Sequence, residues 1–166
     1  MNTRRFLLLI TSMITLSVFM TSCGPGTEEI TLEKYNITMT VPKSESKLEY
    51  KNLKLTERDT KLSRYDFYIG KRVNVIEIKK SIFPDNLAML KKVIASDENI
   101  TEVLETKEFS NGAFGAIFKK KGSSGKEIKY YLFYYQKDGK YFKIEPVFNS
   151  DLKELDAQLA AFESMK

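Results

Sequence analysis

The chain has 166 residues, a formal net charge of +5, one cysteine and no histidine or tryptophan. A chain of this length can form one domain with a substantial core. The absence of histidine excludes nucleophile–histidine catalysis and histidine metal sites, and one cysteine cannot form an intramolecular disulfide. The charge excess is small and the lysines are interleaved with acids, so we expect no nucleic acid partner.

The N-terminal segment has the layout of a secretory signal peptide. Arg4 and Arg5 form a short positive region, and an apolar stretch follows from Phe6 to Met20. This stretch is shorter than the about 20 apolar residues that a membrane-spanning helix needs. A buried globular helix is the alternative, but nothing after Cys23 continues its pattern. We therefore expect residues 1–22 to be a signal peptide.

The residues before the single cysteine, Met-Thr-Ser-Cys at positions 20–23, resemble a bacterial lipobox. Met20 departs from the leucine that is usual there. The resemblance implies cleavage between Ser22 and Cys23, a diacylglycerol thioether on Cys23, and acylation of the new amino group by a fatty acid such as palmitate. The alternative is a free thiol, which an exported protein seldom keeps without purpose. Two acyl chains are enough for stable anchoring in a membrane.

A polar segment without apolar side chains, Gly24 to Glu29, follows the cysteine and predicts a flexible linker. We therefore expect a short lipidated linker over residues 23–29 and one folded domain over residues 30–166. Residue 24 is glycine, whereas an aspartate at this place retains lipoproteins in the inner membrane of some diderm bacteria. This resemblance implies an outer-membrane lipoprotein that faces the periplasm.

The first part of the domain is predicted to form β-strands. Apolar and polar side chains alternate over residues 35–42, and Pro42 ends the run. Residues 47–57 alternate less regularly, and residues 64–80 predict two strands around Gly70 and Lys71. The side chains expected to share one face of the first strand are Tyr35, Ile37, Met39 and Val41.

Two amphipathic helices are predicted from apolar side chains at helical spacing. The first lies within residues 83–99, where Pro84 suits the first turn. Its apolar stripe comprises Leu87, Leu90, Val93 and Ile94. The second lies within residues 150–166, where Asp151 and Glu154 can form a capping box. Its buried stripe is expected to comprise Leu152, Leu155, Leu159 and Phe162.

Two hairpins are predicted between these helices. Residues 100–121 reverse direction at Asn111–Gly112, and residues 128–148 reverse at Asp138–Gly139. Both dipeptides favour a tight turn, because their residues adopt positive φ angles at low cost. Strands, a helix, two hairpins and a closing helix predict an α+β domain. We expect an antiparallel sheet of about six to eight strands with the two helices packed on it.

The element order and the C-terminal pattern, YYQKDGKYF followed by LAAFES, resemble the PsbP-like fold. This family includes an extrinsic photosystem protein and many bacterial lipoproteins. The resemblance covers about residues 30–166 and implies a layered sandwich with a non-catalytic binding or assembly role. The tryptophan that family members often carry after the proline is absent here, and without histidine no metal site is carried over.

Two features are candidates for binding. Lys119, Lys120 and Lys121 gather at one hairpin turn and could contact anionic headgroups, although a solubilising sheet edge is the simpler interpretation. Residues 128–135 carry aromatic side chains on both strand faces, which is typical of a central strand between two layers. The alternative is that one face is exposed for a partner. That face comprises Tyr131, Phe133 and Tyr135.

The sequence contains no spacing that indicates a catalytic centre, a phosphate-binding glycine loop or a calcium loop. We therefore predict a protein without enzymatic activity, cofactor or metal. It is attached to the membrane by its lipid anchor and binds or assembles with another envelope protein. The alternative is an enzyme that acts on envelope polysaccharide, because glycoside hydrolysis needs only two carboxylates.

Overall fold

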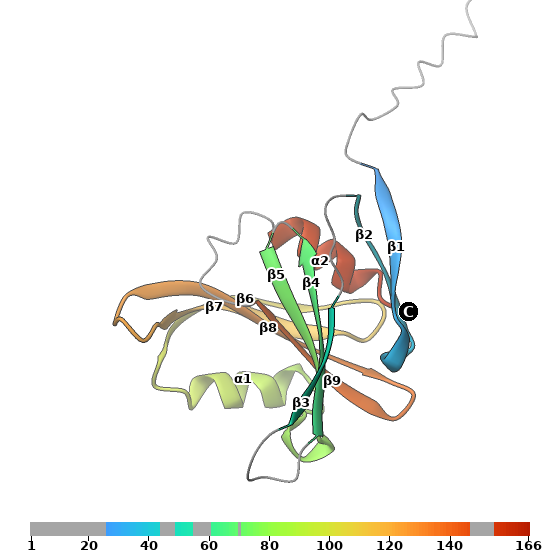
Figure 1. The fold of residues 1–166 in the computed structure, drawn as a ribbon. Coiled ribbons are helices and arrows are strands. Elements are labelled where there is room, and N and C mark those ends of the chain that lie inside the picture. Colours follow the sequence, from blue (N-terminus) through green and yellow to red (C-terminus); the bar gives the residue numbers. More distant parts are fainter. Residues whose placement is uncertain (1–25, 44–48, 55–60, 70, 147–154) are drawn as a thin grey trace, which may run out of the picture.

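The structure is a computed structural model that describes residues 26–43, 49–54, 61–69, 71–146 and 155–166 (Figure 1). The expected signal peptide, Cys23, Leu152 and the expected capping pair lie outside these residues. The strands are β1 Thr27–Leu32, β2 Ile37–Pro42, β3 Glu49–Lys54, β4 Lys61–Ile69, β5 Lys71–Ile78, β6 Ile100–Glu108, β7 Phe114–Lys121, β8 Glu127–Lys137 and β9 Lys140–Pro146. The helices are α1 Leu87–Ala95 and α2 Leu155–Glu163, with 3-10 turns η1 Glu33–Tyr35 and η2 Lys80–Ile82.

Seven strands form one antiparallel sheet in the order β3-β4-β5-β9-β8-β7-β6, and β1 and β2 form a separate hairpin. Strand β9 joins the two halves of the sheet, because it pairs with β5 on one side and with β8 on the other. The prediction of an α+β domain with an antiparallel sheet and two helices is confirmed.

Both predicted hairpin turns are present. Asp138 and Gly139 connect β8 to β9 with φ angles of 51° and 73°, as a two-residue turn of the favoured kind requires. Gly112 has a φ of 83° in the turn between β6 and β7. Local turn chemistry therefore predicted both chain reversals correctly.

Helix α2 and the β1–β2 hairpin cover one face of the sheet. Leu159 and Phe162 of α2 are buried there, as predicted, and Leu155 is partly buried. The four alternating side chains Tyr35, Ile37, Met39 and Val41 are also buried in this core. Its sheet residues are Tyr65, Ile69, Val73, Val75, Ile117, Tyr131, Phe133, Tyr135, Phe142 and Ile144. We call this surface of the sheet the α2 face.

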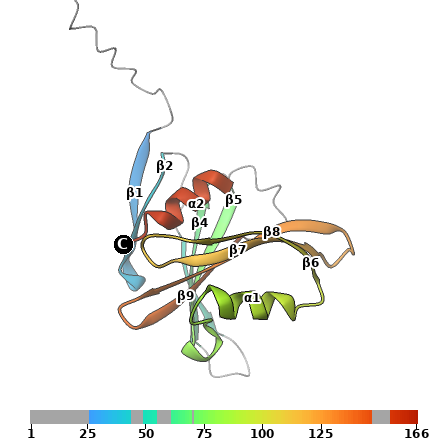
Figure 2. The same cartoon turned by 180° about the vertical axis from the view of Figure 1, so that it is seen from behind.

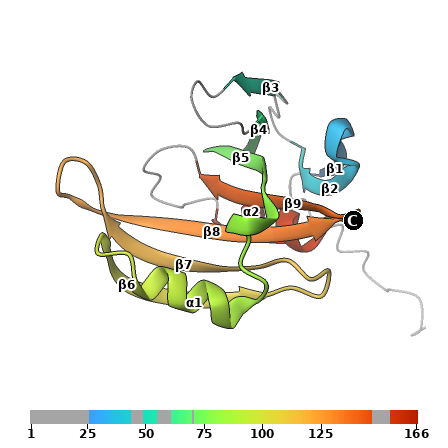
Figure 3. The same cartoon turned by 90° about the horizontal axis from the view of Figure 1, so that it is seen from below.

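Helix α1 packs on the opposite surface, the α1 face, where it lies along β6 and β7 (Figure 3). Leu90 and Ile94 of α1 are buried, and Phe83 packs edge-on against Phe114 and Tyr134. The remaining buried residues of this second core are Ile76, Ile78, Ala116 and Phe118. The sheet is thus enclosed between two layers along part of its surface.

Strand β8 has both of its faces in the core. Tyr131 is fully buried on the α2 face, and Tyr134 is 6% exposed on the α1 face. The prediction of a central strand between two layers is therefore confirmed. The alternative of an exposed face for a partner is wrong, because α2 and its core cover the three side chains concerned. Those side chains are Tyr131, Phe133 and Tyr135.

The first helix begins later than predicted. Asn86 is its N-cap and accepts a hydrogen bond from the Met89 backbone N–H at 2.9 Å, so Pro84 precedes the helix and lies outside its first turn. An asparagine cap satisfies an N–H group that would otherwise lack a partner, which favours this start. The predicted stripe is also too wide, because Val93 is 50% exposed.

The folded domain begins earlier than predicted. Strand β1 starts at Thr27 and pairs with β2, so residues 27–29 are strand, whereas a linker was expected. The outer strand of a hairpin needs little apolar content, which is why β1 was not predicted as a strand. A single residue in the left-handed region, Asn36 with a φ of 55°, connects η1 to β2.

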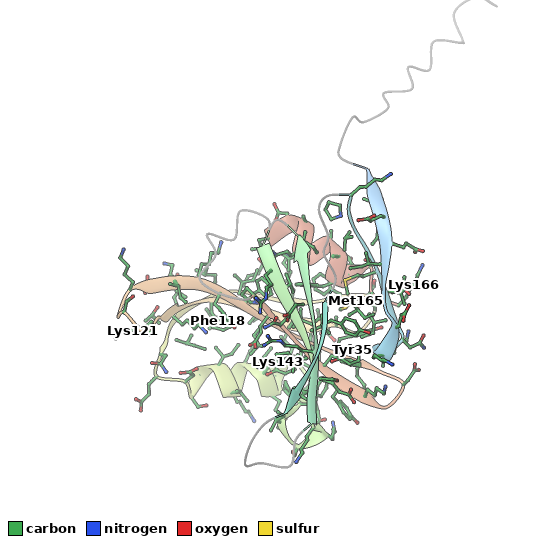
Figure 4. All side chains as sticks on the ribbon, viewed as in Figure 1. Tyr35, Phe118, Lys121, Lys143, Met165 and Lys166 are labelled. Carbon is green, nitrogen blue, oxygen red and sulfur yellow. The ribbon has the colours of Figure 1, made fainter. Side chains whose placement is uncertain are left out.

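The C-terminus is held against the β1–β2 hairpin. Lys166 and Thr38 exchange two backbone hydrogen bonds of 3.0 Å, and the Lys166 side chain lies beside β1, where it is paired with Glu29 (Figure 4). The Asn111 side chain donates hydrogen bonds to the carbonyls of Phe162 and Met165 at 2.8 and 3.0 Å. Asn111 therefore connects the β6–β7 turn to the end of α2.

Candidate functional site

A band of charged and polar side chains crosses the α1 face on strands β4, β5, β9, β8 and β7. Its members are Arg64, Asp66, Arg72, Asn74, Lys120, Tyr130, Lys143 and Glu145, and we call them the charged band. The strand register aligns them, because Asp66 pairs with Asn74, and Asn74 pairs with Glu145. Lys143 lies near the middle of the domain (Figure 4).

Asp66 anchors the band on β4. Its carboxylate is 1% exposed and lies between two arginines, with Arg64 Nε at 3.0 Å from Oδ1 and Arg72 Nη2 at 3.3 Å from Oδ2. Both arginine side chains are partly exposed. A buried charge is tolerated only when it is paired. Replacement of a buried group of charges by apolar residues often leaves the stability of a protein unchanged or raises it. Its presence thus suggests a role other than stability.

Glu145 is the second carboxylate of the band and lies on β9. Its Oε2 accepts a hydrogen bond from the Tyr130 hydroxyl at 3.1 Å and is 3.1 Å from Lys143 Nζ. Burial of the ring, together with the negative charge of Glu145, raises the pKa of Tyr130 above its usual value. Tyr130 therefore remains a hydrogen-bond donor at neutral pH.

Lys120 is the member of the charged band that lies on β7. Its Nζ lies 3.4 Å from the centroid of the Tyr130 ring, a cation–π contact. Burial lowers the pKa of Lys120, with the Glu145 carboxylate acting in the opposite direction. The Lys120 ammonium thus extends the row of interacting side chains from Lys143 through Glu145 and Tyr130 to strand β7.

The band carries four cationic and two anionic side chains, so cations are in formal excess by two. Asn74 at its centre is 7% exposed, and its Oδ1 has no hydrogen-bond partner in the part of the chain that the structure describes. A buried acceptor without a partner costs about 1–3 kcal/mol. Excess cations and an unsatisfied amide suit the binding of a group that carries negative charge together with a donor, such as a hydroxylated anion.

The same geometry is poorly suited to catalysis by two carboxylates. Asp66 and Glu145 lie on strands separated by β5, which corresponds to about 10 Å between backbones. Each carboxylate already lies beside a cation. In a glycosidase the two carboxyl groups must flank the glycosidic bond, whereas here each of them is in contact with cations of the protein itself. The described residues therefore offer this pair little basis for acid catalysis.

The three lysines predicted to contact headgroups do not form one surface. Lys119 is paired with Glu102 at 2.6 Å, and this contact raises the pKa of Lys119. Lys120 lies on the Tyr130 ring, on the opposite side of the strand. Lys121 is exposed at the projecting end of the β7–β8 hairpin (Figure 4). Contact of these lysines with lipid headgroups stays a prediction.

The charged band was missed in the sequence because its members come from five strands. A local signal existed: Asp66 and Asn74 are polar residues within the otherwise apolar runs YDFYI and VNVIEI. A polar residue in such a run marks either an exposed face or a paired buried group. Only the register of β4, β5 and β9 brings Asp66, Asn74 and Glu145 into line.

Comparisons with protein-family models, with curated proteins and with solved structures found no match. Among the described residues, no three or more carboxylate or cysteine side chains lie together as a metal ion would require. No helix in the described ranges is long and apolar enough to cross a membrane.

Proposed function

We propose that the protein is a lipid-anchored binding or assembly protein of the bacterial cell envelope, without catalytic activity, and that its ligand carries an anionic group bound at the charged band. The observation that carries this proposal is the excess of partly buried cations around two carboxylates that are already paired. Such an arrangement attracts and orients an anion without moving protons.

The proposal includes a PsbP-like layered sandwich. Its support is the sheet with α1 on one face and with α2 and the β1–β2 hairpin on the other. The resemblance implies a binding or assembly role, in agreement with the charge pattern of the band. This role needs no cofactor and no metal.

The proposal also includes anchoring through Cys23 in the outer membrane, with the domain in the periplasm. Its support is the lipobox-like sequence and Gly24. Four residue steps separate Cys23 from Thr27, and a chain of that length reaches at most about 14 Å. The start of β1 would therefore lie close to the bilayer.

The proposal is tested by purifying the tagged lipoprotein from detergent-solubilised envelope and identifying the molecules that elute with it. Lys143→Met removes a band cation but retains the length of the side chain, and Lys126→Met makes the same change at an exposed position of the β7–β8 turn. We expect an anionic molecule or partner that is depleted at least fivefold by Lys143→Met and unchanged by Lys126→Met. Equal recovery in both variants would contradict binding at the charged band.

The alternative enzymatic role is tested on the same material. A screen of esters, phosphoesters and glycosides should show no turnover by the purified protein. Reproducible hydrolysis of an envelope polysaccharide that is lost in Asp66→Asn or Glu145→Gln, with the fold retained, would replace the binding role by a catalytic one.

A further inference from the structure

The turn between β6 and β7 contains the dipeptide Asn111–Gly112, and the sequence has no other asparagine that is followed by glycine. Such an asparagine is chemically reactive, because glycine has no side chain to hinder the approach of its own backbone nitrogen to the asparagine side chain. Asparagine is for this reason one of the residues that proteins of hot environments avoid. The turn is therefore a candidate site of covalent modification.

The reaction is a deamidation that consumes only water. The backbone nitrogen of Gly112 forms a bond to Cγ of Asn111 and loses its hydrogen, while the side-chain nitrogen takes up a proton and leaves as ammonia. Water then opens the resulting succinimide ring at either of its carbonyl carbons. The product is an aspartate, or an isoaspartate whose Cβ and Cγ have become part of the main chain.

Hydrogen bonds hold both nitrogen atoms of this reaction in the structure. The Gly112 N–H donates to the carbonyl of Phe109 at 3.0 Å. The side-chain nitrogen of Asn111 donates to three backbone carbonyls at the end of α2. These carbonyls belong to Phe162, Glu163 and Met165, at 2.8, 3.1 and 3.0 Å. Ring closure removes the hydrogen of the first nitrogen and expels the second, so it breaks all of these hydrogen bonds.

The reactivity of Asn111 is thus coupled to the docking of the C-terminal segment, residues 163–166. Figure 2 shows the β6–β7 turn beside the end of α2 and the C-terminus. Hydrogen bonds to β2 fix this segment, because the Thr40 N–H donates to Ser164 Oγ at 2.8 Å and Lys166 pairs with Thr38. The amide keeps its three acceptors while the segment is docked. Local opening of the segment therefore limits the rate of the reaction.

The product does not fit the place of the amide. A carboxylate has no hydrogen to donate, and it would lie against carbonyl oxygens at the end of α2, where the helix dipole is negative. An isoaspartate also adds a carbon atom to the main chain of the turn. Either product therefore weakens the docking that held the reaction back.

We propose that Asn111 is a site of spontaneous deamidation, that the docked C-terminal segment restrains the reaction, and that conversion permanently loosens this segment from β2. Converted chains accumulate with the age of the protein. The loosened contacts belong to the β1–β2 hairpin, whose strand β2 pairs with Lys166 and whose strand β1 carries its partner Glu29. The inference is independent of the charged band and of the proposed lipid anchor.

The rate of conversion is measured by mass spectrometry of the full chain after incubation in mildly alkaline buffer. We expect the folded chain to convert at least tenfold more slowly than the same chain unfolded in urea, because conversion requires opening. Ser164→Ala removes a contact with β2 and should raise the folded rate at least threefold. Ser96→Ala is the matched control and should leave this rate unchanged. Ser96 donates to the Val93 carbonyl at the end of α1, as Ser164 does to the Ala161 carbonyl at the end of α2.

Three results of this experiment would overturn the proposal. Absence of conversion in urea would show that the site is not reactive. Equal rates in the folded and unfolded chains would show that the hydrogen bonds do not restrain Asn111. Equal rates in Ser164→Ala and the wild type would show that docking of the C-terminal segment does not control the reaction.

Hydrogen exchange tests the consequence of conversion. Converted chains carry an additional negative charge, so ion-exchange chromatography separates them from unconverted chains. The amides of Thr38 and Lys166 should exchange at least fivefold faster in the converted fraction, because their mutual hydrogen bonds depend on the docked segment. Equal exchange in the two fractions would refute the loosening.

Discussion

At the scale of single residues, the tyrosines of β8 show how one side chain type serves two purposes. The Tyr130 hydroxyl donates a hydrogen bond to Glu145, and its ring makes a cation–π contact with Lys120. Tyr130 therefore belongs to the charged band. Tyr131 on the opposite side is fully buried, and its hydroxyl has no hydrogen-bond partner among the described residues. Adjacent residues of a strand point to opposite faces, which separates the two environments.

Two substitutions at Tyr131 should have different effects on stability. Tyr131→Ala should lower the unfolding free energy by about 3–5 kcal/mol, because it leaves a cavity in the core. Tyr131→Phe should leave the unfolding free energy unchanged or raise it by about 1 kcal/mol, because it removes an unsatisfied hydroxyl. Urea melts measure both. A large loss in Tyr131→Phe would show that the hydroxyl is satisfied in solution.

A companion substitution tests the opposite face of the same strand. Tyr134 is 6% exposed and packs against Phe83 and Phe114. Tyr134→Ala should therefore lower the unfolding free energy by about 3 kcal/mol or more, whereas surface changes usually stay within about 0.5 kcal/mol. A negligible loss in urea melts would mean that this side of β8 is open to a ligand.

The buried tyrosines should also make stability depend on alkaline pH. Burial raises the pKa of Tyr134 to about 12 and holds the pKa of Tyr131 well above its usual value, which is about 10 in the unfolded chain. Their contribution to stability is complete below pH 10 and is lost as the pH rises toward the folded values, because the unfolded chain then releases protons that the folded chain retains.

Urea melts between pH 9 and pH 11 measure this dependence. Above pH 10 each such tyrosine should lower the unfolding free energy by about 1.4 kcal/mol per pH unit. Tyr131→Phe should reduce the slope by about that amount, since one buried titrating group is lost. Identical slopes for the wild type and Tyr131→Phe would contradict full burial of Tyr131 in the native state.

At the scale of elements, periodicity and turn residues predicted both helices and every described strand except β1, and tertiary contacts decided where these elements end. Asn86 caps α1 and moves its start beyond Pro84. Pairing with β2 makes residues 27–29 a strand although their composition resembles a linker. Val93 follows the apolar periodicity of α1 but lies outside the core. Such ends depend on contacts between distant residues, which a local pattern does not contain.

Asn111 also makes contacts with distant residues that a local sequence pattern does not contain. A substitution at this residue tests their importance. Turn chemistry alone predicts that Asn111→Asp is tolerated, because Asp-Gly and Asn-Gly favour the same turn. In the structure the Asn111 amide donates to the carbonyls of Phe162 and Met165 at the end of α2. An aspartate has no donor there and would oppose two carbonyl oxygens.

We therefore expect Asn111→Asp to lower the unfolding free energy by about 2 kcal/mol, with each lost hydrogen bond contributing about 1 kcal/mol. Hydrogen exchange should accelerate at the amides of Thr38 and Lys166, which pair with one another beyond α2. Urea melts and exchange rates provide the two measurements. An unchanged unfolding free energy in Asn111→Asp would mean that Asn111 contributes to the turn only and that its hydrogen bonds to the end of α2 add no stability.

At the scale of the whole molecule, the fold class followed from the sequence, whereas the candidate site did not. Two strong turn signals and two periodic helices are local features, and they were enough for an antiparallel α+β domain. The charged band depends on β9 lying between β5 and β8, an order that no local pattern specifies. The exposure of Val93 likewise depends on which side of α1 meets the sheet.

The proposed location in the cell envelope depends on the proposed lipidation of Cys23. Labelling of cells with an alkyne fatty acid, followed by detection of the protein, tests it most directly. We expect labelled, processed wild-type protein, and an unlabelled, unprocessed precursor both for Cys23→Ala and for wild-type cells treated with globomycin. Normal processing of Cys23→Ala, or a wild-type chain that takes up no fatty acid, would contradict the proposed lipid anchor.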